Sequence, residues 1–216
     1  MKNKLVSLSV TLLFLGLVGI APAILSQRGV MPIALASAQE SQSSSPAQTD
    51  ITDTLNRHNN TFTIDLAIDA RTIKLNRGLP VTEALRGDNF IIEGKIFPGG
   101  TIPRGGTETE PGPFDPDAPG SIGSWTCRGT FNFDFAEILA GAVPHVTSTQ
   151  IYQLDNGSGL WSDGKEGGMK VTRAVIGGVG KFSGAIGEVH QEPLGINRTG
   201  LANYRFTFKL KRQSRW

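Results

Sequence analysis

The chain has 216 residues, with 21 basic and 19 acidic side chains and a formal charge of +2 at neutral pH. Three of the basic residues, Lys2, Lys4 and Arg28, lie in the first 38 residues, which hold no acidic residue, so 18 basic and 19 acidic side chains remain beyond them. This balance excludes the clustered basic patch that nucleic-acid binding needs, and no nucleic-acid partner is expected.

The single cysteine, Cys127, excludes an intramolecular disulfide, and a chain of this length can bury a core without one. The histidines His58, His145 and His190 are far apart in the sequence, so a zinc site is not expected. Neither a phosphate-binding loop nor a nucleophile elbow is present, so the sequence names no reaction.

Residues 1–38 are predicted to be a secretory signal peptide. Two lysines precede an apolar run over residues 5–25, and Ala36-Ser37-Ala38 matches a small-residue cleavage site. The run is also long enough for an uncleaved membrane anchor, but Pro22 and the late cleavage motif favour removal. We therefore expect a secreted, periplasmic or cell-surface protein without a stable membrane span once the signal is removed.

The stretch from 39 to 50 is rich in serine and glutamine and nearly free of apolar residues, which predicts a flexible linker. A single domain is then expected over residues 51–216. Alternating apolar and polar residues predict its strands. These strands are 61–69, with 72–75 as a continuation or a short second strand, 89–97, 124–134, 146–154, 171–176, 182–189 and 201–211.

Connections of several kinds separate these strands. Residues 98–123 form a long loop rich in glycine and proline, which suits a covering flap or a loop lining a barrel mouth. The segments 155–168, which carries Trp161, and 191–200 are also expected to be loops, and residues 135–141 a helical turn.

The segment from Val171 to Val189 predicts a hairpin. Gly177, Gly178 and Gly180 crowd into its turn, where positive φ angles are needed. Gly184 and Gly187 are expected inside its second strand, where glycine marks a bulge or a sharp bend. Eight short strands with one apolar face each predict an all-β fold, an eight-stranded antiparallel closed β-barrel, with a β-sandwich as the alternative.

The hairpin also carries a family resemblance. The run Ile176-Gly-Gly-Val-Gly-Lys-Phe-Ser-Gly-Ala-Ile-Gly187 resembles the Gly-Gly-Thr-Gly-x-Phe/Tyr-x-Gly-Ala-x-Gly signature of allene oxide cyclase-like and dirigent-like barrels. It departs from the signature at Val179, in place of threonine, and at Ile186, in place of the usual arginine. Residues 115–131 resemble the corresponding region of bacterial proteins with this barrel.

This resemblance implies a barrel with a central cavity for a small hydrophobic or phenolic ligand, and no metal or organic cofactor. It implies a homo-oligomer, since the plant relatives are often trimers. Those relatives either cyclise an unstable fatty-acid epoxide or steer the coupling of phenolic radicals, and in both the barrel acts by orienting a reactive substrate. The resemblance therefore leaves open whether this chain has a cyclase-like or coupling-steering activity or only binds.

Five residues on the apolar strand faces are candidates for lining a ligand cavity: Trp125, Cys127, Phe131, Tyr152 and Phe206. The alternative is that they fill the barrel completely, as in a structural or surface-interaction protein without a cavity. Glu188 and His190 lie on one face of a strand and form a candidate acid–base pair at a barrel mouth, although an exposed strand end gives the same pattern.

Overall fold

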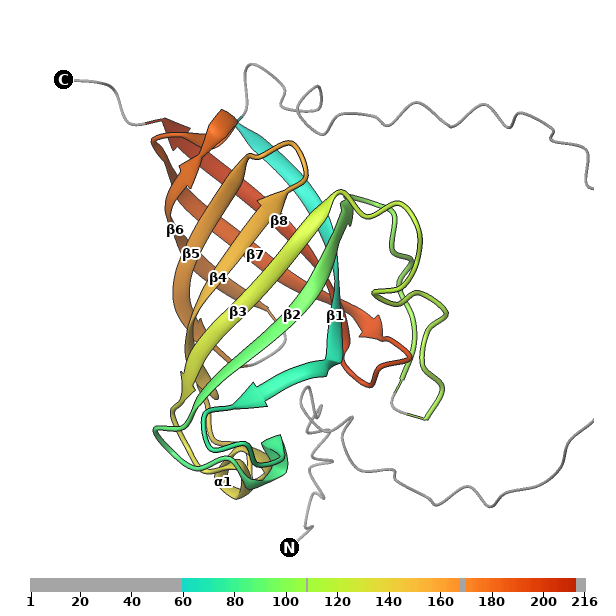
Figure 1. Cartoon of the computed structure of the whole chain (residues 1–216), viewed down its shortest axis with the longest axis vertical. Coiled ribbons are helices and arrows are strands. Elements are labelled where there is room, and N and C mark those ends of the chain that lie inside the picture. The colour runs from blue at the N-terminus through green and yellow to red at the C-terminus, as the bar shows by residue number, and fades with distance from the viewer. Residues whose placement is uncertain (1–59, 108, 168–169, 213–216) are drawn as a thin grey trace, which may run out of the picture.

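The computed structural model describes residues 60–107, 109–167 and 170–212. The predicted signal peptide (1–38), the linker (39–50) and residues 51–59 lie outside the described residues. The rest of the chain confirms the predicted closed barrel of eight antiparallel strands, in which each strand pairs with the next and β8 pairs with β1 (Figure 1). The sandwich alternative is wrong, because no strand edge is left open for a second sheet.

The elements follow one another around the barrel in chain order. The strands are β1 (Thr61–Leu75), β2 (Asn89–Pro98), β3 (Gly123–Phe131), β4 (Val146–Leu154), β5 (Gly159–Glu166), β6 (Val171–Val179), β7 (Ala185–Ile196) and β8 (Ala202–Arg212). The short helices are η1 (Val81–Glu83), α1 (Phe135–Leu139) and η2 (Gly180–Phe182). In the described ranges, no helix has the length and apolar character to cross a membrane.

Two segments expected to be loops are strands. Residues 155–168 contain β5, whose inward side chains include Ser162, Gly164 and Glu166, so it lacks the apolar alternation that marks a strand. The segment expected as a loop from 191 contains the second half of β7, where the register with β8 shifts between Pro193 and Gly195. Residues 72–75 continue β1 beyond an irregularity in its pairing with β2.

The predicted hairpin is present as β6, η2 and β7. Gly187 lies inside β7 as predicted, with a φ of 148°. A Cβ atom at this position would lie 2.2 Å from the Lys209 carbonyl oxygen, so no larger residue fits. The placement of Gly184 inside the strand is wrong, since β7 begins at Ala185 and Gly184 has a φ of 73° in the turn.

The long loop after β2 packs against the outer wall of the barrel rather than over its mouth. Its Ile102, Phe114 and Ala118 join a small second core with outward residues of β1, β2 and β7. Asp65 of β1 lies beneath the loop and is fully buried. It accepts hydrogen bonds from the loop amides of Gly100 and Ile102, each at 2.9 Å. We name this segment, residues 99–122, the strap; it runs beside β1 and β2 (Figure 1).

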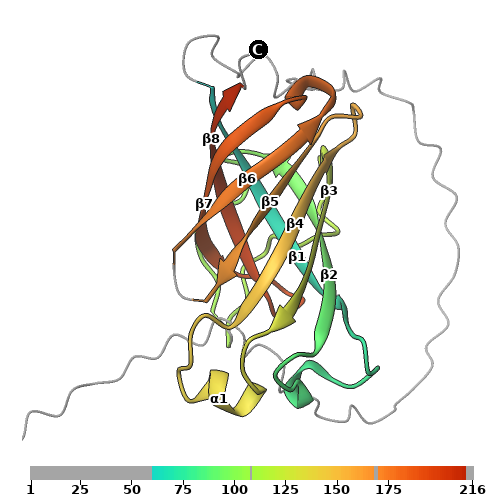
Figure 2. The same cartoon turned by 90° about the vertical axis from the view of Figure 1, so that its left-hand side faces the viewer.

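The barrel interior differs between its two ends. At the end near η2, Phe62 stacks on Phe208 and Phe182 with ring centroids 4.7 and 5.3 Å apart, which fills the space with apolar rings. The opposite end is flanked by η1 and α1, which are held together by the Phe135 amide donating to the Ala84 carbonyl (Figure 2). Buried polar side chains gather inside this second end, and they define the candidate site.

Candidate functional site

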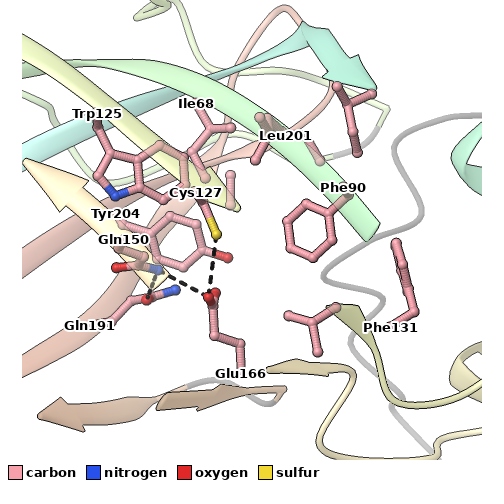
Figure 3. A pocket seen from close by; sticks show the side chains of 14 residues that line it. Ile68, Phe90, Trp125, Cys127, Phe131, Gln150, Glu166, Gln191, Leu201 and Tyr204 are labelled. Carbon is pink, nitrogen blue, oxygen red and sulfur yellow. Dashed lines mark hydrogen bonds between the residues drawn. The ribbon is translucent and has the colours of Figure 1, made fainter. Parts of the chain in front are cut away.

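A pocket lies inside the barrel at the α1 end. Its apolar walls come mainly from β1, β2, β3 and the start of β8, and its polar groups from β3, β4, β5, β7 and β8 (Figure 3). The apolar lining residues are Ile68, Ile73, Phe90, Ile92, Phe131, Val146, Leu201 and Ala202. The others are Trp125, Cys127, Gln150, Glu166, Gln191 and Tyr204. A hydrophobic cavity with a few converging polar groups is the usual form of a small-molecule site.

Strand alternation and register place the polar groups on this inner wall. In β4, Ser148 and Gln150 point inward in the same row as Val146 and Tyr152. The antiparallel pairing then sets Ser148 beside Gly164 and Val146 beside Glu166 of β5. A strand whose inward positions are serine, glycine and glutamate leaves room that leucine or phenylalanine would occupy.

Glu166 is the centre of the polar cluster, with a side chain that is 14% exposed. Its Oε1 accepts hydrogen bonds from the Gln150 amide at 3.1 Å, from the Arg173 guanidinium at 3.0 Å and from the Ser148 hydroxyl. The Cys127 thiol also donates to Oε1, at 3.7 Å. All four bonds end on Oε1, and no hydrogen bond to Oε2 is found within the described residues.

Arg173 supplies the positive charge beside Glu166. Its side chain is completely buried, and its remaining donors reach the Ser162 hydroxyl at 3.2 Å and the Ser148 carbonyl at 2.6 Å. A buried arginine without a carboxylate would be strongly unfavourable, and so would the carboxylate alone. The pair therefore fixes the Glu166 carboxylate at one position in the pocket wall.

Gln150 links this pair to the opposite side of the cluster. Its Oε1 accepts from the Tyr152 hydroxyl, and its Nε2 also reaches Gln191 Oε1 at 3.4 Å. Burial raises the pKa of Tyr152 and of Tyr204 far above the ordinary value, so both hydroxyls stay protonated. Because Tyr152 donates to Oε1 of Gln150, the amide nitrogen is the atom that faces Glu166.

Cys127 has the environment of a hydrogen-bond donor rather than of a nucleophile. Burial raises the pKa of its thiol well above the ordinary value, and the negative charge of Glu166 raises it further. The thiol therefore remains protonated at neutral pH and stabilises the carboxylate. Its side chain contributes to the pocket wall between Trp125 and Glu166 (Figure 3).

Trp125 is buried to 3% exposure, and its Nε1 has no hydrogen-bond partner among the described residues. A buried donor left unpaired costs about 1–3 kcal/mol, and native proteins rarely retain such a donor without a reason. Figure 3 shows the nitrogen edge of the indole on the side of Gln150 and Tyr204. Trp125 is thus a polar group of the pocket that the protein does not satisfy.

The cavity has a volume of about 50 Å³. A cavity of roughly 150 Å³ binds benzene, so this one is smaller than an aromatic ring requires. Three of its lining residues, Ile68, Ile73 and Glu166, are only partly buried, whereas the other lining residues are buried.

Of the five candidates named from the sequence, Trp125, Cys127 and Phe131 lie in the pocket wall. Tyr152 and Phe206 lie deeper in the barrel and contact each other edge to face, at 5.5 Å between ring centroids. Tyr152 contributes through its hydrogen bond to Gln150. Whether any of these residues contacts a ligand stays a prediction.

The central residues Glu166, Arg173, Gln150 and Gln191 were not among the candidates. Arg173 follows the alternation of β6 to the inside, where an arginine is not expected without a known partner. The candidate pair Glu188 and His190 is formed, with 3.6 Å between Glu188 Oε2 and His190 Nε2, but it lies on the outer face of β7 and not at a barrel mouth. Within the described ranges, no three acidic, histidine or cysteine side chains cluster as metal ligands.

No protein-family model matches the sequence, and no curated protein matches it significantly. Among solved structures, the pterocarpan synthase dirigent protein PsPTS1 is similar over 72% of this chain and 96% of its own, with 11% identity and a TM-score of 0.50. A pyocyanin demethylase is similar over 70% of this chain and 99% of its own, with 15% identity and a TM-score of 0.44. A nonspecific heme-binding cyclase of neoabyssomicin biosynthesis is similar over 82% of this chain and 84% of its own, with 10% identity and a TM-score of 0.41.

The similarity to the dirigent protein shows a shared fold. The chain therefore has the allene oxide cyclase-like or dirigent-like barrel that its glycine motif resembles, and this prediction is confirmed. At these identities the fold alone is shared, and the chemistry of this chain has to be argued from its own pocket.

Proposed function

We propose that this protein is an exported barrel that binds a small, mostly apolar molecule with a hydroxyl group, of the phenol type, in the pocket at the α1 end. The observation that carries the proposal is the Glu166 carboxylate, held by Arg173 through Oε1 and lining an otherwise mostly apolar cavity. An ionised carboxylate only accepts hydrogen bonds, so it favours a ligand that donates one and repels an anion.

The walls favour a flat ring as the carrier of that hydroxyl. Phe90, Phe131 and Tyr204 line the pocket, and Phe90 and Phe131 already meet at 5.3 Å in an edge-to-face arrangement. Aromatic walls of this kind pack well against another aromatic ring. The cavity of about 50 Å³ is smaller than the roughly 150 Å³ that binds benzene, so its walls have to move apart to admit one ring.

The decisive experiment is a titration with 4-methylphenol, followed by calorimetry. We expect millimolar or tighter binding to the wild-type protein, weakened roughly tenfold or more in Glu166→Gln, because a hydrogen bond to a charged group contributes about 1.5–3 kcal/mol. Glu188→Gln is the matched control, since it removes an exposed carboxylate on the outer wall. Equal binding to wild type and Glu166→Gln would contradict the proposal.

A second measurement needs no assumption about the ligand. Native mass spectrometry of the protein purified from its own host is expected to show a retained small aromatic molecule, lost in Glu166→Gln. Export is tested by sequencing the N-terminus of the mature protein, which is expected to begin at Gln39. A mature chain that still carries residues 1–38 would refute cleavage of the predicted signal.

A further inference from the structure

We propose that Trp125 is a second recognition point in the pocket, so that the ligand carries an acceptor oxygen, carbonyl or ether, in addition to the hydroxyl that meets Glu166. This inference rests on the proposed function and narrows its ligand class from a simple phenol to a molecule with both a donor and an acceptor. Trp125 would then determine specificity, because only an acceptor satisfies its indole N–H.

Trp125 Nε1 differs from the polar groups around it in having no hydrogen-bond partner among the described residues. The Gln150 amide, the Cys127 thiol and the Glu166 carboxylate are all engaged in hydrogen bonds with the protein. Trp125 lines the same pocket, and its indole N–H is buried and has no partner in the described part of the chain. A pocket in which one donor alone is unpaired is suited to a ligand that supplies the missing acceptor.

The protein cannot easily supply that acceptor itself. Gln150, on the neighbouring strand, already uses its Oε1 to accept from Tyr152. Exchanging the positions of its amide oxygen and nitrogen would break that bond and place the oxygen against the Glu166 carboxylate. The arrangement that stabilises Glu166 therefore also keeps Trp125 free for a ligand.

The separation between Trp125 and Glu166 along the pocket wall suits a small ligand that contacts both. Trp125 and Cys127 are two residues apart on the inner face of β3, which separates their Cα atoms by roughly 6–7 Å. Cys127 in turn contacts Glu166 through its thiol at 3.7 Å. One aromatic ring with two substituents has the length to reach from the carboxylate to the indole along this wall.

The test compares pairs of ligands that differ only in the acceptor. The 2-, 3- and 4-hydroxybenzaldehydes are titrated against the corresponding methylphenols, which have the same shape but no carbonyl. We expect at least one aldehyde to bind wild-type protein roughly tenfold more tightly than its methyl counterpart, and the advantage to disappear in Trp125→Phe. Trp161→Phe, on the outer face of β5, is the matched control and is expected to keep the advantage.

A measurement on the wild-type protein tests the inference even if the Trp125→Phe variant does not fold. In a ¹⁵N correlation spectrum of the wild-type protein, the indole resonance that the favoured aldehyde shifts downfield is expected to be unmoved by its methylphenol. If methylphenols bind in a Glu166-dependent way but no aldehyde binds more than about twofold better, the inference is wrong and the proposed function stands. If neither class binds, the proposed function fails and the inference fails with it.

Discussion

Asp65 and Glu166 are both paired with arginines in this barrel, and their hydrogen bonds are arranged differently. Asp65, beneath the strap, accepts from Arg205 through both oxygens, at 2.8 and 2.9 Å, and from two loop amides. Glu166, inside the barrel, accepts four hydrogen bonds through Oε1 and lines a pocket. Both oxygens of Asp65 accept hydrogen bonds, whereas within the described residues Glu166 accepts through Oε1 alone.

This difference separates a structural carboxylate from a functional one. Both ion pairs carry the desolvation cost of buried charge, which hydrogen bonds must offset. At Asp65 the hydrogen bonds fasten the strap to the outer wall, so the result is stability. At Glu166 they hold one oxygen in place beside a cavity, so the result is a prearranged acceptor. Four substitutions test this contrast, from the largest expected effect to the smallest.

Replacing Arg173 by methionine is expected to have the largest effect. The change leaves the Glu166 carboxylate buried without its positive partner, and the free energy of unfolding is expected to fall by about 3–5 kcal/mol. Urea unfolding of the variant measures this loss. Arg71→Met, which removes a mostly exposed arginine from its pair with Asp69, is the control and is expected to cost less than about 1 kcal/mol.

Asp65→Asn is expected to destabilise the protein by about 2–4 kcal/mol, because it removes the charge that Arg205 and the strap amides share. Phenol affinity, measured on the folded variant, is expected to stay at the wild-type value, since Asp65 faces the outer wall. A variant that unfolds normally but loses ligand binding would contradict the separation between the two carboxylates.

Glu166→Gln is expected to reverse this pattern. The amide oxygen can still accept from Arg173 but does not neutralise its charge, so a loss of stability of about 2–4 kcal/mol is expected, while ligand binding weakens roughly tenfold or more. Chemical unfolding and calorimetric titration of the same preparation give both numbers. A Glu166→Gln protein that binds the ligand as tightly as the wild type would show that the carboxylate serves structure alone.

A third pair, Asp88 with Arg77 at the α1 end, joins a buried carboxylate to a partly exposed arginine and serves as the reference. The Arg77 guanidinium and then the Leu85 amide lower the pKa of Asp88 below its ordinary value of 3.8. Because the pKa of Asp88 is lower in the folded than in the unfolded state, its ionised form stabilises the folded protein at any pH above the unfolded-state pKa. This stabilisation is lost as the pH falls through the folded-state pKa.

Asp88→Asn is accordingly expected to make unfolding less dependent on pH below about pH 4, with a small loss of stability at neutral pH. Thermal unfolding between pH 2 and pH 7 measures both effects. An unchanged acid slope in the variant would show that other carboxylates control acid unfolding.

The features that could be predicted are those that depend on local pattern. Alternation in residues 124–131 and 201–211 specified two strands and their apolar faces, because a half-buried strand imposes period two. Gly180 and Gly187 have the positive φ angles that the pattern predicts, because few other residues tolerate them, but the placement of Gly177 and Gly178 in the turn is wrong, since both lie in β6. The strand β5 was missed because Ser162 and Gly164 on its inner face have no apolar signal.

The candidate site was only half predictable for the same reason. Trp125, Cys127 and Phe131 were found because large apolar side chains on an inward face must line whatever the barrel encloses. Glu166 and Arg173 were not found, because charged residues in a strand are normally expected to face solvent. The two charges can be buried because they form an ion pair with 3.0 Å between Arg173 Nη1 and Glu166 Oε1, and this contact is visible only in the tertiary structure.

By itself, the sequence determined most of the strands and the aromatic wall of the interior, since each depends on spacing along one strand. It left a closed barrel and a sandwich open, and the pairing of β8 with β1 decides for the barrel. The tertiary structure decided that β4, β5 and β6 pair so that Gln150, Glu166 and Arg173 meet in one cluster. It also decided that the Trp125 indole N–H has no hydrogen-bond partner among residues 60–107, 109–167 and 170–212, and that the strap is hydrogen-bonded to Asp65. These features depend on the register in which the strands pair, because the register decides which side chains of different strands meet in the pocket.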